Sequence, residues 1–300
     1  MSLIAFLGAI EIGLVFGLVA LGVFLSFRVL QFPDLTVDGS FPLGAAVAAT
    51  LIVSGVNPYL ASLIAALAGA LAGLVTAWLN VRLKILHLLA SILTMIALYS
   101  INLRIMGRPN VALLGDETVL TPLEALPLPS YWLAPVLFLI VVAAAKLLVD
   151  RFLASEIGLA IRATGANPRL SRALGISTDR LILSGMALSN ALVALAGALF
   201  AQSQGSADIS MGVGVIVVGL AAVILGEAVV PGRGIALATL GCILGSILYR
   251  LAVALALNAD VLGLQAQDLN LLTAILVALA MVLPGERRRF RALFQRSGGR

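Results

Sequence analysis

Long apolar runs separated by short polar stretches dominate this chain from end to end. A run of roughly 20 residues is long enough to cross a hydrocarbon core of about 30 Å, and a helix satisfies its own backbone groups in lipid. The pattern therefore predicts an all-α polytopic membrane protein with about nine transmembrane segments, in a range of about eight to ten. The predicted segments lie near residues 3–27, 41–56, 59–81, 86–106, 131–150, 181–203, 212–230, 234–257 and 268–284.

The pattern is interrupted near residues 30–43, which read LQFPDLTVDGSFPL. Proline removes a backbone donor and glycine weakens a helix, so this stretch is not typical of a continuous span. Irregular backbone is tolerated at membrane depth only where protein or a water-filled cavity surrounds it. We therefore expect a broken or re-entrant segment, interrupted at Pro33, Gly39 and Pro42.

Four acidic residues fall within or beside apolar runs, namely Glu11, Asp34, Asp38 and Glu227. An isolated carboxylate at the bilayer centre costs about 3 kcal/mol, so each should face a wet cavity, an interface or a partner group. Asp34 and Asp38 adjoin the interruption, where they could line a solute pathway or cap the following helix. Glu227 is a candidate for a gate or pathway contact and could pair with Arg233. Glu11 could line the pathway or lie near the outer surface.

A polar island at residues 155–176 reads SEIGLAIRATGANPRLSRALGI and separates two apolar runs. It predicts two short helices, because Asn167 can cap a second helix whose first position is Pro168. Gly165 and Gly175 would allow the turns that lay both helices flat along a membrane face. The arginines of the island would then meet lipid phosphates or an acidic groove of a partner protein. An ordinary amphipathic loop is the alternative.

Most lysines and arginines fall on one side of the nine-segment arrangement, which identifies that side as the cytoplasm. They are Arg28, Arg82, Lys84, Arg151, Arg162, Arg169, Arg172, Arg180, Arg233 and the arginines of the tail. The N-terminus is therefore expected outside and the C-terminus inside, with residues 1–285 as one transmembrane domain and 286–300 as a basic cytoplasmic tail. Arg104, Arg108 and Arg250 fall toward the outer side, where their long side chains would reach the interface.

Composition excludes several classes of protein. The 300 residues are 61% hydrophobic and 11% charged, and the mean hydropathy is +1.13, which is more apolar surface than a soluble domain can bury. The one cysteine, Cys242, excludes an internal disulfide and is expected to be a small core residue. The start of the chain lacks the basic leader of a signal peptide, so we expect a retained span. The net charge of +5 resides mainly in cytoplasmic segments and gives no support for nucleic-acid binding.

The sequence contains no catalytic, cofactor-binding or metal-binding pattern, such as zinc-type spacing, a phosphate-cradling loop or a nucleophile elbow. His87, the one histidine, is expected to be an interfacial helix residue near a membrane face. A membrane enzyme acting on lipid would need clustered acids or histidines, which the polar island lacks. An ion-coupled secondary transporter would favour paired broken helices, whereas only one clear break is apparent.

The polar island resembles the coupling-helix signature of the permease family that serves branched-chain amino acid and sugar ABC importers, a pattern close to G-x-A-x-R-A-x-G-x-N-P-x-x-A-x-x-x-G-I. The matching residues are Gly158, Ala160, Arg162, Ala163, Gly165, Asn167, Pro168, Gly175 and Ile176, with Ser171 where alanine is common. The resemblance implies that the island contacts a cytoplasmic ATPase. The implied coupling residues are Glu156, Gly158, Arg162, Gly165, Asn167, Pro168, Arg169, Arg172 and Gly175.

Three further blocks are similar to this family, in the same order along the chain. Residues 21–40 resemble a sugar-permease pattern ending in D-L-S-V-G-S, residues 195–212 resemble the stretch leading into the late helices, and residues 219–248 resemble a glycine-spaced block. Asp38 and Glu227 depart from these patterns and leave the solute open. The glycines of the last block should let two late helices pack closely, in the interior or at a subunit contact.

The resemblance implies the permease subunit of a bacterial inner-membrane ABC importer, which forms the pathway for an amino acid or a similar small solute. A sugar or nucleoside permease is the alternative. The implied partners are two cytoplasmic ATPase subunits, an extracytoplasmic solute-binding protein and a second permease subunit, most simply a second copy of this chain. Hydrolysis of ATP is expected in the separate ATPase, so this chain itself is not expected to be an enzyme.

Overall fold

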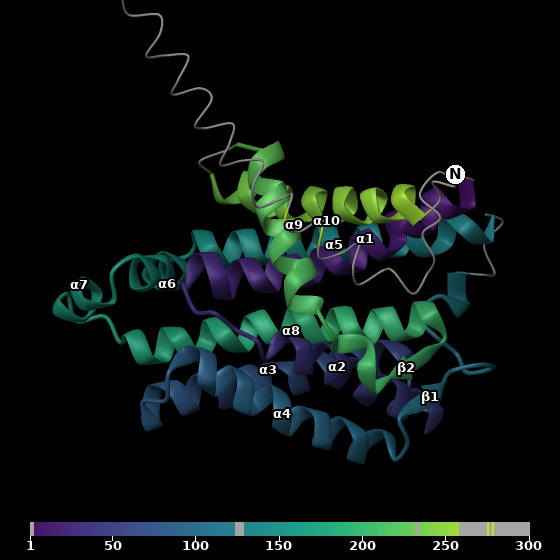
Figure 1. The fold of residues 1–300 in the computed structure, drawn as a ribbon, viewed down its shortest axis with the longest axis horizontal. Coiled ribbons are helices and arrows are strands. Elements are labelled where there is room, and N and C mark those ends of the chain that lie inside the picture. Colours follow the sequence, from purple (N-terminus) through teal and green to yellow (C-terminus); the bar gives the residue numbers. More distant parts are fainter. Residues whose placement is uncertain (1–2, 124–128, 232–233, 258–274, 276–277, 279–300) are drawn as a thin grey trace, which may run out of the picture.

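The computed structural model describes residues 3–123, 129–231, 234–257, 275 and 278 (Figure 1). Its helices are α1 (Leu3–Val23), which continues into the π-helical turn η1 (Phe24–Val29), α2 (Val37–Val53), α3 (Pro58–Leu83), α4 (His87–Met106), α5 (Ser130–Ala154), α6 (Glu156–Ala166), α7 (Pro168–Ala173), α8 (Thr178–Gln204), α9 (Val215–Val229) and α10 (Ile235–Leu257). Short 3-10 turns are η2 (Thr121–Leu123) and η3 (Ile209–Gly212). Within these residues, seven helical segments are long and apolar enough to cross a membrane.

The helix positions agree with the hydrophobic pattern to within a few residues at α1, α3, α4, α5, α8, α9 and α10. The predicted segment 41–56 corresponds to α2, whose 17 residues extend only about 26 Å. This length is less than the thickness of a hydrocarbon core. The predicted segment 268–284 and the tail 286–300 fall outside the described residues apart from two isolated positions, so the total of nine segments stays a prediction.

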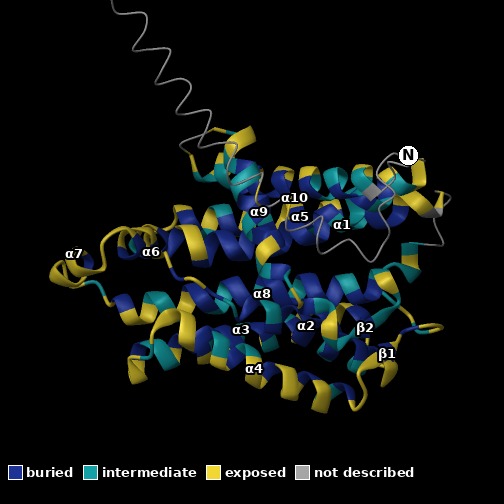
Figure 2. Ribbon diagram, in the orientation of Figure 1, coloured by how far each residue is buried: buried dark blue, intermediate teal, exposed yellow. Residues whose placement is uncertain are grey.

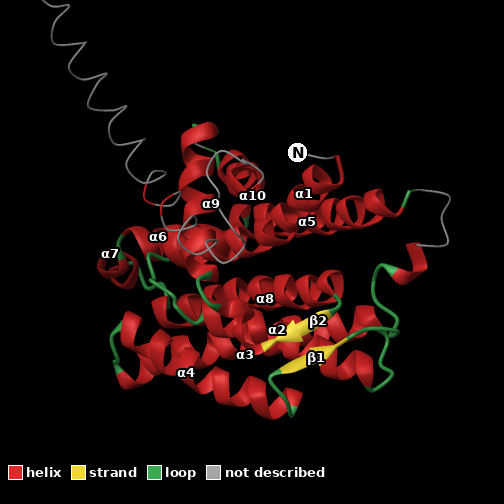
Figure 3. Ribbon diagram, turned by 45° about the vertical axis from the view of Figure 1, so that its right-hand side comes forward, coloured by secondary structure: helices red, strands yellow, loops and turns green. Residues whose placement is uncertain are grey.

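A two-stranded ribbon corrects the expectation of a purely helical chain. β1 (Asn110–Ala112) follows α4 and pairs antiparallel with β2 (Ser206–Asp208), which follows α8 (Figure 3). The ladder pairs backbone groups of two loops that would otherwise need other partners. Hydrogen bonds from Ser210 hold the pKa of the Asp208 carboxyl below its ordinary value.

The helix pair α6–α7 and the ribbon lie at opposite ends of the molecule (Figure 1). We call these the helix-pair end and the ribbon end. α5 leads directly into α6 at the helix-pair end, and α8 returns from α7 to the ribbon end. The polar island of the sequence is thus held at one end of the bundle, away from the lipid-facing surfaces of the long helices.

Two long helices, α1 and α8, organise the core. α8 packs against α2 and α3, α1 packs against α9 and α10, and α1 and α8 also contact each other. The residues of α1 and α8 are mostly buried, whereas α3, α4 and α5 carry many exposed apolar residues (Figure 2). α2 follows α1 in the chain but packs on α8, and α9 follows α8 but packs on α1. The two halves of the chain are therefore interlocked.

Glycine lets these helices approach closely. A Cβ at Gly44 of α2 would overlap the carbonyl group of Ala194 in α8. Because lipid tails are as apolar as side chains, helix association in a membrane relies on such close packing. Gly226 of α9 faces Gly241 of α10, as the glycine-spaced block predicted.

The helices α2 and α9, called the two short helices of the bundle below, each begin after an interruption of the helical backbone. α2 starts at Val37, earlier than the expected residue 41, and Pro42 lies inside it. Residues 205–214 connect α8 to α9 and contain β2 and η3. This connection falls between the predicted segments 181–203 and 212–230.

We predict that Gly44→Ala lowers the free energy of unfolding by about 1–3 kcal/mol, because the added methyl group forces α2 and α8 apart. The matched control is Gly8→Ala in α1, where an added Cβ meets nothing within 4 Å. That control should be neutral or slightly stabilising, since alanine favours a helix by about 1 kcal/mol over glycine. Thermal unfolding in detergent measures both variants, and equal midpoints would contradict the packing role.

Candidate functional site

The two short helices of the polar island are present as α6 and α7, and their termini follow local sequence signals. The Ser155 hydroxyl accepts a hydrogen bond of 3.3 Å from the Gly158 backbone, and the Asn167 side-chain oxygen accepts one of 3.0 Å from Leu170. Pro168 occupies the first turn of α7, where its missing N–H has no cost. Gly175 ends the island with a φ of +80°, which favours glycine.

α6 is seated directly on the backbone at the end of the first span. Gly165 is buried, and a Cβ there would overlap the carbonyl oxygen of Val29 in η1. Gly158 is buried in the same way against the backbone of Phe152 and Leu153 at the end of α5. The two glycines of the signature therefore fix α6 rigidly between the ends of α5 and η1.

The solvent-exposed face of the helix pair is both apolar and basic. Four large apolar side chains are 54–70% exposed: Ile157, Leu159, Leu170 and Leu174. Glu156, Arg162 and Arg169 are also exposed. Arg172 is exposed as well, and its Nε donates a 2.9 Å hydrogen bond to the Thr178 hydroxyl. Exposed leucines beside arginines at the tip of a bundle are typical of a protein-docking surface.

Asp34 is 2% exposed and lies in the interruption between η1 and α2. Its Oδ1 accepts a 2.9 Å hydrogen bond from the backbone of Thr36, and its Oδ2 accepts one of 2.8 Å from the Asn190 amide of α8. The Ser40 hydroxyl donates in turn to Asn190 Oδ1 at 2.7 Å. These contacts support the start of α2 and tie it to α8, and the lining of a pathway by Asp34 stays a prediction.

Asp38 joins the two short helices. Its carboxylate accepts hydrogen bonds from the backbone N–H groups of Gly214 (3.3 Å) and Ile216 (2.7 Å), at the start of α9. Pro42 leaves the Asp38 carbonyl without its helical partner, and Gly212 lies against that oxygen. The N-termini of α2 and α9 therefore meet inside the protein at Asp38.

α2 and α9 lead from this junction to different parts of the protein. The far end of α2 packs at the ribbon end, where Ile52 lies with Met106 and Val111. Near the far end of α9, Glu227 forms an ion pair with Arg28 of η1. The Arg28 Nε donates to Glu227 Oε1 at 2.5 Å, and its terminal nitrogen donates to the other carboxylate oxygen.

Glu227 pairs with Arg28 among the described residues, whereas the expected partner Arg233 lies outside them, so that pairing stays a prediction. The Arg28 and Glu227 side chains are 51% and 36% exposed. Arg28 adjoins Val29, against which Gly165 of α6 packs. The ion pair thus links the end of α9 to the segment that supports the helix pair.

Arg250 also corrects an expectation. Its guanidinium does not reach the outer interface but lies over the ring of Phe16, 4.0 Å from the ring centroid. Phe16 is at the middle of the first span, which runs from Leu3 to Val29. The charged group therefore points into the membrane-spanning part of the protein.

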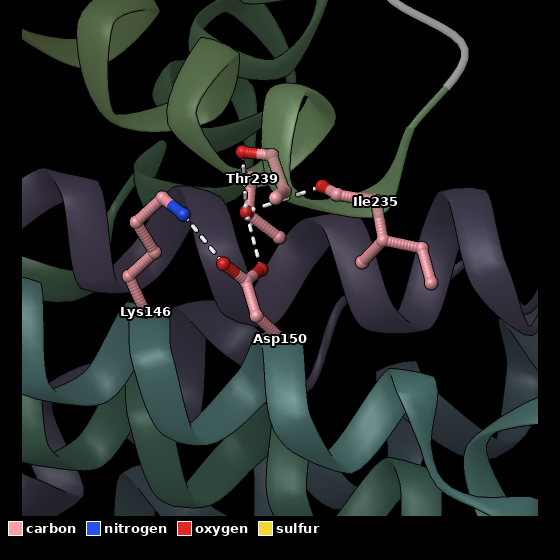
Figure 4. A network of polar contacts seen from close by, with 5 residues as sticks. Lys146, Asp150, Ile235 and Thr239 are labelled. Carbon is pink, nitrogen blue, oxygen red and sulfur yellow. Dashed lines mark hydrogen bonds and ion pairs between the residues drawn. The ribbon is translucent and has the colours of Figure 1, made fainter.

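A polar network that the sequence analysis did not predict joins α5 and α10 (Figure 4). The Lys146 ammonium lies 2.5 Å from Asp150 Oδ2, and the Thr239 hydroxyl donates to Asp150 Oδ1 at 2.6 Å. The Lys146 and Asp150 side chains are 17% and 16% exposed. Their spacing of four residues was the available signal, since it places both on one face of a helix.

We predict that Asp150→Asn destabilises the protein by about 3 kcal/mol, because it leaves the Lys146 ammonium without a carboxylate. Thr239→Val removes one hydrogen bond and should cost only about 1 kcal/mol. The double variant Lys146→Met/Asp150→Leu removes both charges and should recover most of the lost stability. Denaturant unfolding in detergent tests this order, and a double variant as unstable as Asp150→Asn would contradict it.

Comparison with known proteins identifies the family to which this chain is similar. Residues 6–283 match the family model described as "Branched-chain amino acid transport system / permease component". The chain is 37% identical over 264 residues to the "Tyrosine transport system permease protein" of Clostridioides difficile, covering 88% of this chain and 86% of that protein. It is 33% identical over 287 residues to an uncharacterized protein of Rickettsia prowazekii, covering 91% and 95%.

A third similar protein is the "Probable branched-chain amino acid transport permease protein LivH" of Methanocaldococcus jannaschii, with 28% identity over 203 residues and 64% of each chain covered. The family match covers the described bundle almost completely, including the junction at Asp38 and the α6–α7 pair. Together with the seven apolar helices, these similarities show that this multi-pass membrane protein belongs to the family of permease components of branched-chain amino acid transport systems.

Proposed function

We propose that this chain is the permease subunit of an ATP-driven, binding-protein-dependent importer, and that it forms the pathway for an amino acid. Family membership supports an amino acid as the solute, and the relative named as a tyrosine permease favours one with an aromatic side chain. The helix-pair end faces the cytoplasm in this proposal, because most of the arginines and lysines lie there. The N-terminus is then outside and the C-terminus inside.

The main support for the proposal is the composition of the solvent-exposed face of α6 and α7. Four exposed apolar residues and the exposed Arg162 and Arg169 lie on a helix pair that glycine contacts fix to the bundle. Such a surface is suited to an ATPase groove that combines apolar and acidic groups. An ATPase subunit needs a rigid contact, because displacement of a loosely held loop would not be transmitted to the transmembrane helices.

A continuous set of contacts is available to carry such a push into the bundle. α6 rests on Val29 through Gly165, Arg28 precedes Val29, and Arg28 pairs with Glu227 at the end of α9. α9 begins in turn at Asp38, where α2 also begins. Displacement of α6 would thus bias both short helices, whose junction lies inside the protein. We assign the pathway to this region, with Asp34, Asp38 and Glu227 as its candidate polar residues.

The proposed assembly contains two such membrane subunits, two cytoplasmic ATPase subunits and one extracytoplasmic binding protein. An ABC importer requires two membrane halves, and one chain of this size supplies one half. A pair of identical chains is the simplest arrangement. Hydrolysis of ATP belongs to the ATPase subunits.

We expect Arg162→Glu and Gly165→Leu to reduce amino acid uptake by about 10-fold or more, because each disturbs a docking contact or its support. The assay is uptake of radiolabelled tyrosine and leucine into proteoliposomes that contain the permease, its ATPase and its binding protein. Membrane insertion and the basal ATPase rate should stay unchanged. The matched charge-reversal control is Arg108→Glu, an exposed position at the ribbon end. Wild-type uptake in both test variants would remove the docking role, and uptake without any ATPase would refute the importer itself.

The pathway assignment is tested with a single cysteine at position 34 in a Cys242→Ser background, since Cys242 is the only native cysteine. Asp34 is enclosed in the present conformation. If the junction opens during transport, a small hydrophilic thiol reagent should modify Asp34→Cys in one nucleotide state and not in the other. Uniform protection in all states would leave Asp34 with the helix-supporting role alone.

A further inference from the structure

Part of the Arg250 guanidinium has no hydrogen-bond partner among the described residues. The Nε group is buried and finds no hydrogen-bond acceptor among the residues that the structure describes. The guanidinium instead lies over the Phe16 ring at 4.0 Å. An arginine within a membrane-spanning bundle is costly unless it is paired, and such residues commonly mark a solute path. Stacking on an aromatic ring leaves the donors at the edge of the guanidinium free for an anion.

The ring under Arg250 belongs to a cluster of three phenylalanines from three helices. Phe16 (α1), Phe41 (α2) and Phe200 (α8) have ring centroids 5.6–6.0 Å apart, in tilted and edge-to-face arrangements. Aromatic rings favour such offset and edge contacts with one another. Phe41 lies one helical turn from Asp38, so the cluster adjoins the junction of the two short helices.

An acidic group lies next to the cluster on the side of the ribbon end. Glu11 of α1 accepts a hydrogen bond from the Ser203 hydroxyl of α8. Ser203 follows Phe200 by three residues, so both lie on one face of α8 about 4.5 Å apart along its axis. Glu11 has a second carboxylate oxygen, and no positive group pairs with it among the described residues.

We propose that Arg250, the phenylalanine cluster and Glu11 form an internal binding site for a zwitterionic amino acid with an aromatic side chain. The guanidinium of Arg250 binds the α-carboxylate with paired hydrogen bonds. Glu11 binds the α-ammonium, and the phenylalanine cluster contacts the solute ring. This site deepens the proposed function and rests on it, since it assigns residues to the aromatic amino acid that the proposed function already favours.

The guanidinium, the carboxylate and the aromatic rings match the α-carboxylate, the α-ammonium and the aromatic side chain of one solute. An anion alone would need no carboxylate nearby, and an amine alone would be repelled by Arg250. A purely aliphatic amino acid would satisfy both charged groups but would gain less from aromatic contacts. The site therefore predicts a preference for tyrosine or phenylalanine over leucine, and for the whole amino acid over either half.

The test measures binding of radiolabelled L-tyrosine to the purified full-length permease in lipid nanodiscs. Competitors are L-phenylalanine, L-leucine, tyramine, which lacks the carboxylate, and 3-(4-hydroxyphenyl)propionate, which lacks the ammonium. We expect phenylalanine to compete as well as tyrosine and each of the other three to be weaker by ~10-fold or more. This series requires no variant, so it does not depend on the folding of any mutant.

Variants then assign the roles. Arg250→Gln should reduce tyrosine binding by ~10-fold or more and abolish the advantage of tyrosine over tyramine. Arg250→Lys keeps the charge but not the planar guanidinium, so its tyrosine affinity should lie between those of the wild type and Arg250→Gln. Phe16→Leu should reduce the preference for tyrosine over leucine. The matched control is Arg104→Gln, an exposed arginine of α4. Unchanged tyrosine binding in Arg250→Gln, or equal competition by tyramine in the wild type, would overturn the site.

Failure of the site and failure of the proposed function give different results. If the reconstituted complex transports no amino acid, the proposed function is wrong. If the wild-type complex transports tyrosine and the Arg250→Gln complex does so at the same rate at tyrosine concentrations below saturation, the importer stands and this site is wrong.

Discussion

The architecture depends on one constraint, that a helix interrupted inside a membrane must have its exposed backbone groups satisfied by protein. Asp38 meets this constraint for α9, because its carboxylate binds the backbone of Gly214 and Ile216. Asp34 does the same for α2 through Thr36. Once these two carboxylates are in place, both short helices can begin in the interior. The crossed packing of α2 on α8 and of α9 on α1 then follows.

Much of this fold could be predicted from the sequence, because apolar runs report directly on spans in lipid. The interruption near 30–43 and the two helices of the polar island carry proline, glycine and capping residues, so they were also predictable. The connection at 205–214 was predicted as a gap between two spans, but its strand was not, because that strand forms by pairing with the distant residues 110–112.

Side-chain partners were the least predictable part, because they depend on which helices pack together. Glu227 pairs with Arg28, which is 199 residues away in the chain. Arg250 was expected at the interface because it lies near the end of an apolar run. The structure turns it toward Phe16, since α10 packs against α1. Proximity in sequence therefore identified where charges occur but not what they contact.

The meeting of two helix N-termini at Asp38 has an electrostatic consequence. Each N-terminus carries a partial positive charge of about +0.5 from its aligned peptide dipoles, and such ends commonly attract anions. Here each end already faces a carboxylate of the chain itself, Asp34 for α2 and Asp38 for α9. The two carboxylates thus occupy the places at these helix ends where a further anion would otherwise bind.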